Sequence, residues 1–417
     1  MEINVIRLRN ILDDREEQVK KDNTNFLEEI NNELIEDDLL LKEGSKDAAM
    51  SIIFVETGGC EASFVKIFPE IKDNLILLLS NGKNNSLPAS FEIKTYCSLN
   101  DTPAIIVTGD EKNCANVIRH FSRVYHAKAQ LKNNNLAVIG EPSDWLIASK
   151  VEPSVIKEKF DINIINISME ELMEEIDKKE MVKIPHQDAL RKKYKDAEIL
   201  DGAFYIYSAL KRLVKKYNLD GLTIRCFDLL GKYKNTACLA LALLNEEGIT
   251  SACEGDVPAL LTMHMLYALT GRSSFQANPS TVNQETKEVL FAHCTLPLNM
   301  VSKYELLTHF ESNLGIGIKG DMPLGEVTIC KLFIDKKHTL KNSIAIGGTI
   351  RENLSLPGYC RTQINVQLSD YDFVSLFKED FGNHLIITYG PVVDDFYTLV
   401  TLYDMKNIMK DVNELDD

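Results

Sequence analysis

The sequence predicts an α/β protein with two parallel-sheet, Rossmann-like domains followed by a mainly antiparallel, β-barrel-like domain. In the first two thirds, short continuous apolar segments end in small polar loops and alternate with helix-length segments, which is typical of parallel strands covered on both faces. From about residue 287, β-rich segments follow one another with few helices between them, which favours an antiparallel sheet or barrel. We therefore place domains at residues 1–140, 141–286 and 287–417.

The first domain begins with a strand-like alternation over residues 1–7 and a charged, helix-prone stretch over residues 13–45. Buried strands are predicted at 51–55, 75–79 and 104–108, because each is an apolar run that leads into a loop containing glycine. This order of elements predicts a parallel sheet.

The second domain opens with the strand at residues 136–139 and continues through a strand at 161–167 and a long helix near 201–217. A second apolar helix is expected at 259–269, where Gly271 ends it. The third domain is predicted from its β-rich segments, which lie at 289–292, 326–334, 343–346, 362–368 and 384–389.

Composition limits the function. The chain has 417 residues and a formal charge of −16, which argues against a nucleic-acid partner, because such proteins need basic faces against phosphates. No apolar run is long enough for a membrane span, so we expect a cytoplasmic protein without a membrane partner. The nine cysteines are scattered and include no Cys-x-x-Cys pair, which is typical of a reduced protein whose thiols pack in the interior.

Two acidic motifs in the middle of the chain are the main functional signal. Asp228 follows the β-prone residues 222–224, Asp256 follows those at 249–252, and the apolar run at 236–245 between them should be a buried helix. A βαβ unit brings the carboxyl ends of its strands to one edge of the sheet, where α/β proteins bind ligands. The pair therefore predicts a divalent-metal site or an acid/base site.

The alternative for either aspartate is that it caps the helix that follows it, a favoured position for this residue. Glu254 lies two residues before Asp256 and either shares its face of an extended segment or braces a turn. Cys226, Cys253 and Cys294 lie close to these acids or to a histidine, and packing is a simpler explanation for them than a thiolate metal centre.

Among the histidines, His293 and His384 are the site candidates, because His293 ends an apolar strand and His384 follows Gly382 at the start of another. His264 falls within an apolar helix and is expected to pack there. The chain has no Gly-x-Gly-x-x-Gly or Gly-Lys-Ser/Thr phosphate loop and no Gly-x-Ser-x-Gly element, so neither nucleotide binding nor a serine hydrolase is indicated.

The motif at residues 253–263, together with 85–89, 142–146 and 292–294, resembles the L-fucose isomerase/L-arabinose isomerase family, and most closely its shorter fucose-isomerase-like members. The resemblance implies two α/β domains before a barrel-like domain, a free sugar as substrate, and a homo-oligomer, a trimer or a hexamer. It also implies a divalent cofactor, Mn²⁺ or alternatively Mg²⁺.

Carried over by position, the resemblance makes Asp228, Asp256 and His384 the metal ligands, with Asp228 and Asp256 also catalytic. The well-known isomerases usually have glutamate at the first of these positions, so the side chain of Asp228 is one methylene shorter. We assign Glu254 and His293 to the substrate's hydroxyl groups or to support of the ligands.

This chemistry also suits the residues themselves. Aldose–ketose isomerisation through an enediol needs a base that moves a proton between adjacent carbons and a cation that stabilises the developing negative charge. A metal-dependent aldolase or epimerase could use the same residues. A non-catalytic sugar-binding regulatory protein is the alternative outside enzymes, and it would need neither the carboxylate pair nor the metal.

Overall fold

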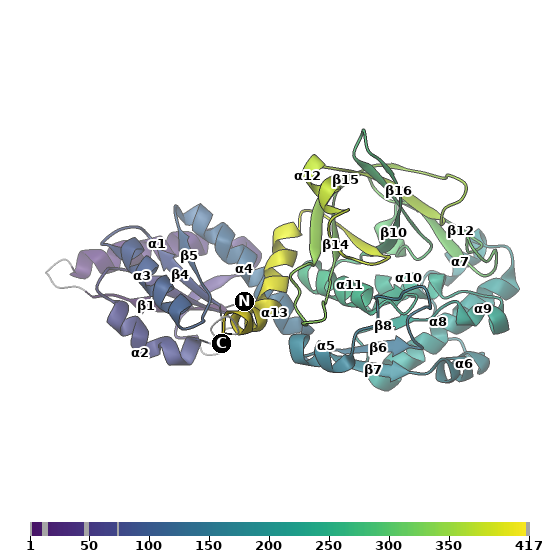
Figure 1. Cartoon of the computed structure of the whole chain (residues 1–417), viewed down its shortest axis with the longest axis horizontal. Helices are drawn as coiled ribbons and strands as arrows, with labels where there is room; N and C mark the ends of the chain where they lie inside the picture. Colours follow the sequence, from purple (N-terminus) through teal and green to yellow (C-terminus); the bar gives the residue numbers. More distant parts are fainter. Residues whose placement is uncertain (1, 11–15, 46–49, 73–74, 414–417) are drawn as a thin grey trace. The chain divides into compact units, whose positions relative to one another are not determined.

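The computed structural model describes residues 2–10, 16–45, 50–72 and 75–413. The chain divides into two compact units, one formed by residues 1–129 together with 405–417 and the other by residues 130–404. Figure 1 shows the order of their elements by colour. Among the described residues, no helix is both long and apolar enough to cross a membrane.

The first unit contains a five-stranded, all-parallel sheet in the order β2-β1-β3-β4-β5. Strands β3 and β4 are buried along almost their whole length, as their continuous apolar sequences require. The elements of this unit are β1 (Glu2–Leu8), α1 (Glu16–Leu34), β2 (Leu40–Glu43), β3 (Ser51–Val55), α2 (Glu61–Ile71), β4 (Ile76–Ser80), α3 (Ser86–Leu99), β5 (Ala104–Thr108) and α4 (Glu111–Leu131).

The second unit begins with a four-stranded parallel sheet in the order β7-β6-β8-β9. Strands β8 and β9 are neighbours, as the βαβ argument requires. The elements of this part are β6 (Asn135–Ile139), α5 (Pro153–Phe160), β7 (Asn163–Ile167), α6 (Met169–Asp177), α7 (Gln187–Lys193), α8 (Ala197–Tyr217), β8 (Gly221–Ile224), α9 (Asp228–Tyr233), α10 (Cys238–Glu246), β9 (Thr250–Cys253) and α11 (Val257–Thr270).

The same unit continues into a closed antiparallel barrel with the strand order β10-β11-β16-β15-β14-β17. Its strands are β10 (Phe275–Asn283), β11 (Glu288–His293), β14 (Gly325–Lys331), β15 (Ile344–Asn353), β16 (Thr362–Leu368) and β17 (Leu385–Tyr389). The separate pair β12 (Lys303–Leu307) and β13 (Gly317–Asp321) and the helix α12 (Asp370–Ser375) belong to the same unit, whereas the helix α13 (Val393–Asn413) begins in it and continues into the first unit from residue 405. The predicted fold class, parallel α/β sheets followed by an antiparallel barrel, is confirmed.

The second sheet and the barrel each begin earlier in the sequence than the domain boundary that we placed before them. The second parallel sheet starts with β6 and the barrel starts with β10, before residues 141 and 287 respectively. Within the second unit, α11 contacts β8 of the sheet as well as β14 and β17 of the barrel, and it lies between the two in Figure 1. The amino end of α11 therefore faces both layers.

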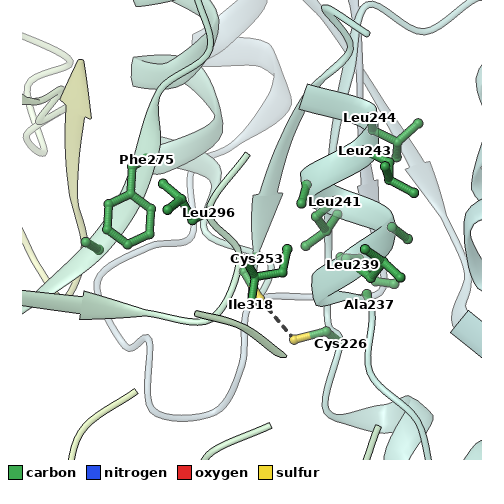
Figure 2. Packing of buried hydrophobic residues seen from close by; sticks show 14 of the residues in the cluster. Cys226, Ala237, Leu239, Leu241, Leu243, Leu244, Cys253, Phe275, Leu296 and Ile318 are labelled. Atoms are coloured by element: carbon green, nitrogen blue, oxygen red, sulfur yellow. Dashed lines mark hydrogen bonds between the residues drawn. The ribbon is translucent and has the colours of Figure 1, made fainter. Parts of the chain in front are cut away.

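The core of the second unit joins these layers. Helix α10 is apolar on all sides, and its residues from Leu239 to Leu244 are fully buried. Figure 2 shows these leucines packed beside Cys226 and Cys253, with Phe275 and Ile318 from the barrel side nearby. The site described below is built on this continuous apolar base.

Candidate active site

The turn that follows β9 is held tightly at the carboxyl edge of the sheet. Glu254 and Gly255 both have left-handed backbone conformations, with φ of 64° and 72°. The Gly255 N–H donates to the Ile224 carbonyl of β8, and the Ser143 N–H donates to the Glu254 carbonyl. A Cβ atom at Gly255 would lie 2.5 Å from the carbonyl oxygen of Glu141, so only glycine fits there.

Glu254 carries the central carboxylate of the site. A positive φ is costly for a residue with a side chain, and such strain is concentrated at functional sites. Its Oε2 accepts a hydrogen bond of 2.6 Å from Trp145 Nε1, while its Oε1 lies 3.6 Å from His384 Nε2 and 3.8 Å from His293 Nε2. These last two distances are too long for hydrogen bonds, so both imidazoles face Glu254 Oε1 without bonding it.

Asp256 is fully buried and uses both carboxylate oxygens. Its Oδ1 accepts from the Ala259 N–H and so caps α11, as the alternative explanation for this residue predicted. Its Oδ2 accepts from Lys331 Nζ at 3.0 Å and is 2.9 Å from His384 Nδ1. Asp256 therefore both caps a helix and belongs to the site.

His384 is buried between the two carboxylates, directly before β17. The contact with Asp256 assigns one proton to Nδ1, because a carboxylate only accepts. Burial opposes the charged ring, but Asp256 and Glu254 raise the pKa of His384, so Nε2 offers a lone pair only when the ring is neutral. Within the described part of the chain, that Nε2 has no hydrogen-bond partner. In the neutral ring this nitrogen is a buried acceptor that faces a carboxylate oxygen, and a cation between the two atoms would satisfy both.

His293 approaches the same point from β11. Its Nδ1 is 2.9 Å from Thr295 Oγ1, which leaves Nε2 directed toward Glu254. The rings of His293 and His384 lie 5.3 Å apart, centroid to centroid, at 71°. One imidazole nitrogen of each histidine thus faces the same carboxylate oxygen of Glu254.

The pKa values report the electrostatics of this buried group. Burial opposes the charged form of Glu254, but His293 and His384 outweigh it and hold the pKa of this carboxyl well below its usual range. Burial is likewise outweighed at Asp256 by Lys331 and His384, so the pKa of Asp256 is also low. Burial lowers the pKa of Lys331, although Asp256 opposes this shift. Both carboxylates are therefore ionised at neutral pH.

The group whose ligand atoms lie mutually close contains a thiol and does not contain His384. Cys253, Glu254 and His293 each offer one ligand atom, and these atoms lie within 4.8 Å of one another, which makes them a possible metal-holding group among the described residues. Cys253 Sγ also lies 3.2 Å from Cys226 Sγ, the contact drawn as a dashed line in Figure 2. Both thiols are buried.

Four of the five predicted site residues come together here: Glu254, Asp256, His293 and His384. Asp228 is the first residue of α9, has a side chain that is 39% exposed, and pairs with Arg225 Nε at 3.1 Å. Its neighbours reach the site, because Cys226 contacts Cys253, and the ring of Phe227 lies 4.9 Å from that of Trp145.

Sequence reasoning missed the roles of Trp145 and Lys331. Lys331 ends an apolar strand, and a lysine in such a position has to find a buried counter-charge, so the signal was present in the β14 sequence. Trp145 lies in a loop far from Glu254 in sequence, and nothing in its local pattern indicates the hydrogen bond that it makes.

No family model matches the chain. It is similar to the sulfoquinovose isomerase of Alkalicoccus urumqiensis, with 24% identity over 344 residues, which span 77% of this chain and 75% of that protein. The enzyme of the same name from Clostridium sp. (strain MSTE9) is 25% identical over 306 residues, 70% of this chain and 66% of the relative. A third, from Priestia megaterium, is 20% identical over 346 residues, with shares of 77% and 75%.

The three relatives carry the name of one sugar isomerase, so the class of protein to which this chain is related is that of the sugar isomerases. This similarity supports an enzyme, an aldose–ketose isomerase, over a regulatory protein.

Proposed function

We propose that the chain is a metal-dependent aldose–ketose isomerase that acts on a free sugar through an enediol. The observation that carries this proposal is that Glu254 Oε1 faces both His293 Nε2 and the buried His384 Nε2, which has no hydrogen-bond partner within the described residues. The similarity to sulfoquinovose isomerases supports the reaction class independently of this geometry.

The donor set fits a divalent cation. Glu254, His293 and His384 would hold it, and the carboxylate–imidazole mixture suits Mn²⁺, with Mg²⁺ as the alternative. When bound, the cation would polarise the sugar's oxygens and stabilise negative charge on the enediolate. Asp256 fixes the Nδ1–H tautomer of His384 and so directs the Nε2 lone pair into the site. This geometry favours Asp256 as a positioning residue over the direct ligand role that we predicted for it.

A base must take the proton from the carbon next to the carbonyl and return it to the neighbouring carbon. Asp228 is our candidate, since its carboxylate is partly exposed and follows two residues that contact the site. In this structure, Arg225 donates hydrogen bonds to Asp228, to Asp144 and to the Pro142 carbonyl. A change of partner by Arg225 would release Asp228 for proton transfer or for the ligand role that the family resemblance implies.

The identity of the sugar belongs to the proposal as well. Sulfoquinovose, the sugar named for the relatives, is the first substrate to test, followed by pentoses, hexoses and deoxysugars. A metal-dependent aldolase or epimerase remains the alternative enzyme, because an enediolate can also lead to those reactions.

The test is to incubate the protein with Mn²⁺ and each sugar in deuterated water and to follow the products by NMR. The proposal predicts a ketose that carries deuterium on carbon. Smaller fragments would identify an aldolase, and an exchanged aldose of inverted configuration would identify an epimerase. Sugar binding without exchange on any member of the panel would contradict an isomerase and favour a regulatory protein.

A further inference from the structure

Trp145 lies beside the candidate metal ligand Glu254 and is the only tryptophan in the sequence. Its Nε1–H donates to Glu254 Oε2 at 2.6 Å, yet the residue remains 52% exposed. One edge of the indole is therefore committed to the buried carboxylate, while much of its ring stays open to solvent.

The loop after β6 holds this indole in place. The Ser143 N–H donates to the Glu254 carbonyl, and the Leu146 N–H donates back to the Ser143 carbonyl, so the loop is anchored on both sides of Trp145. Leu146 is itself buried, and the ring of Phe227 meets the indole edge-on. These contacts hold the indole where its N–H donates to Glu254.

We propose that Trp145 is a positioning residue of the candidate centre, one that keeps Glu254 Oε2 occupied so that Oε1 alone faces His293 and His384. Its open ring face then forms the wall against which the carbon chain of the sugar packs. This inference rests on the proposed function, because it assigns roles within the same site.

The physical reason lies in the two equivalent oxygens of a carboxylate. Without a donor on Oε2, the Glu254 carboxylate could turn and present either oxygen, or both, to a cation. A fixed donor selects one oxygen and one orientation, and outer partners of this kind typically change metal affinity by about 10- to 100-fold. The indole face suits the C–H groups of a sugar, because aromatic rings provide a rigid apolar surface next to polar groups that fix orientation.

The single tryptophan allows a direct experiment on the full chain. Fluorescence of Trp145 is followed while Mn²⁺ alone is added, and the same titration is followed by calorimetry. The inference predicts a saturable fluorescence change whose dissociation constant equals the calorimetric one, because Trp145 donates a hydrogen bond to Glu254, a proposed metal ligand. In Glu254→Gln, both the heat of binding and the fluorescence change should be lost.

Two variants separate the roles of the N–H and the ring. Trp145→Phe keeps a ring but removes the donor, so Mn²⁺ affinity should fall roughly tenfold or more, while KM at saturating Mn²⁺ changes little. Trp145→Gln keeps a donor but removes the ring, so KM for the sugar should rise with a smaller effect on Mn²⁺ affinity. Circular dichroism checks that both variants are folded.

The outcomes distinguish this inference from the proposed function. If Mn²⁺ binds the wild-type protein and the Phe variant equally well and leaves Trp145 fluorescence unchanged, the positioning role is wrong although the metal site stands. An unchanged KM in Trp145→Gln would overturn the role of the ring as a sugar wall. Failure of the wild-type protein to bind Mn²⁺ would overturn the proposed metal site and this inference together.

Discussion

Replacing Asp256 with asparagine tests how the buried charges of the site support one another. In the wild-type protein, Asp256 Oδ1 caps α11, while Oδ2 lies 3.0 Å from Lys331 Nζ and 2.9 Å from His384 Nδ1. The side chain of Asp256 is fully buried and that of Lys331 is 2% exposed. Asparagine can keep the cap, but its NH₂ group then stands where two donors need an acceptor.

The magnitude follows from the lysine left behind. If Lys331 is deprotonated in the folded variant at pH 7, removing its proton costs about 4.6 kcal/mol of folding free energy, because its ordinary pKa of about 10.4 lies about 3.4 pH units higher and each unit corresponds to about 1.36 kcal/mol. Removing one member of a buried ion pair typically costs about 3–5 kcal/mol, in agreement with this figure. We therefore expect Asp256→Asn to lose about 3–5 kcal/mol of unfolding free energy at pH 7, and less as the pH rises.

Urea unfolding of Asp256→Asn and of the double variant Asp256→Asn/Lys331→Met provides the measurement and its control. Removing both charges leaves no buried lysine without a partner, so the double variant should recover much of the lost stability. A loss below about 1 kcal/mol in the single variant, or no recovery in the double variant, would refute this reasoning.

Metal binding should behave differently from stability in the same variants. Neither variant has a carboxylate on His384 Nδ1, so Mn²⁺ affinity should stay about 10- to 100-fold below wild type even where stability recovers. Calorimetric titration of the double variant separates the two effects. Recovery of both stability and Mn²⁺ affinity would show that Asp256 acts only through the fold.

Four further predictions concern Gly255, His264, Asp228 and the oligomeric state. Gly255→Ala should lower the free energy of unfolding in urea by about 3 kcal/mol or more, because the added Cβ would lie 2.5 Å from a backbone atom. Gly271→Ala is the control, because open space surrounds Gly271, and it should lower this free energy by only about 1–2 kcal/mol. Equal losses in the two variants would contradict this prediction. Burial lowers the pKa of His264 to about 4, so the free energy of unfolding should fall as the pH drops from about 6.5 toward 4. His264→Gln should reduce this dependence on pH, and an unchanged dependence in the variant would refute the role of His264. Asp228→Asn should lower kcat by about 10²- to 10⁴-fold at unchanged stability, and wild-type turnover would remove Asp228 as the base. Light scattering should show a trimer or hexamer, and an active species with the mass of one chain would contradict the predicted homo-oligomer.

The architecture was predictable because strong local signals carry it. Continuous apolar runs such as β3 and β4 can only be buried strands, and the all-apolar helix α10 placed β8 and β9 side by side. The βαβ geometry then brought the motif around Glu254 and Asp256 to the edge of the sheet. The start of the barrel at β10 was missed because the sequence of this strand is largely polar and contains Pro279.

The details of the site depended on contacts between residues far apart in sequence. Spacing placed Asp256, with Glu254 beside it, at the edge of the sheet, and the family resemblance joined His384 and His293 to them, but neither indicated which oxygen faces which nitrogen. The roles of the individual oxygens depend on two residues from elsewhere in the sequence. Lys331 of the barrel forms an ion pair with Asp256, and Trp145, in the loop after β6, donates a hydrogen bond to Glu254. The contact of Trp145 has no local sequence signature, and the apolar sequence of β14 indicates that Lys331 needs a buried counter-charge but not which residue supplies it.

The central claim is that Glu254 Oε1 and the two imidazoles hold a divalent cation. Its most direct test is a calorimetric titration of the chelator-treated protein with Mn²⁺, in parallel with Glu254→Gln. The account predicts one saturable site per chain in the wild-type protein and loss of that site in the variant, because a neutral amide replaces the carboxylate that faces both His293 and His384. Equal Mn²⁺ binding by both proteins would contradict it.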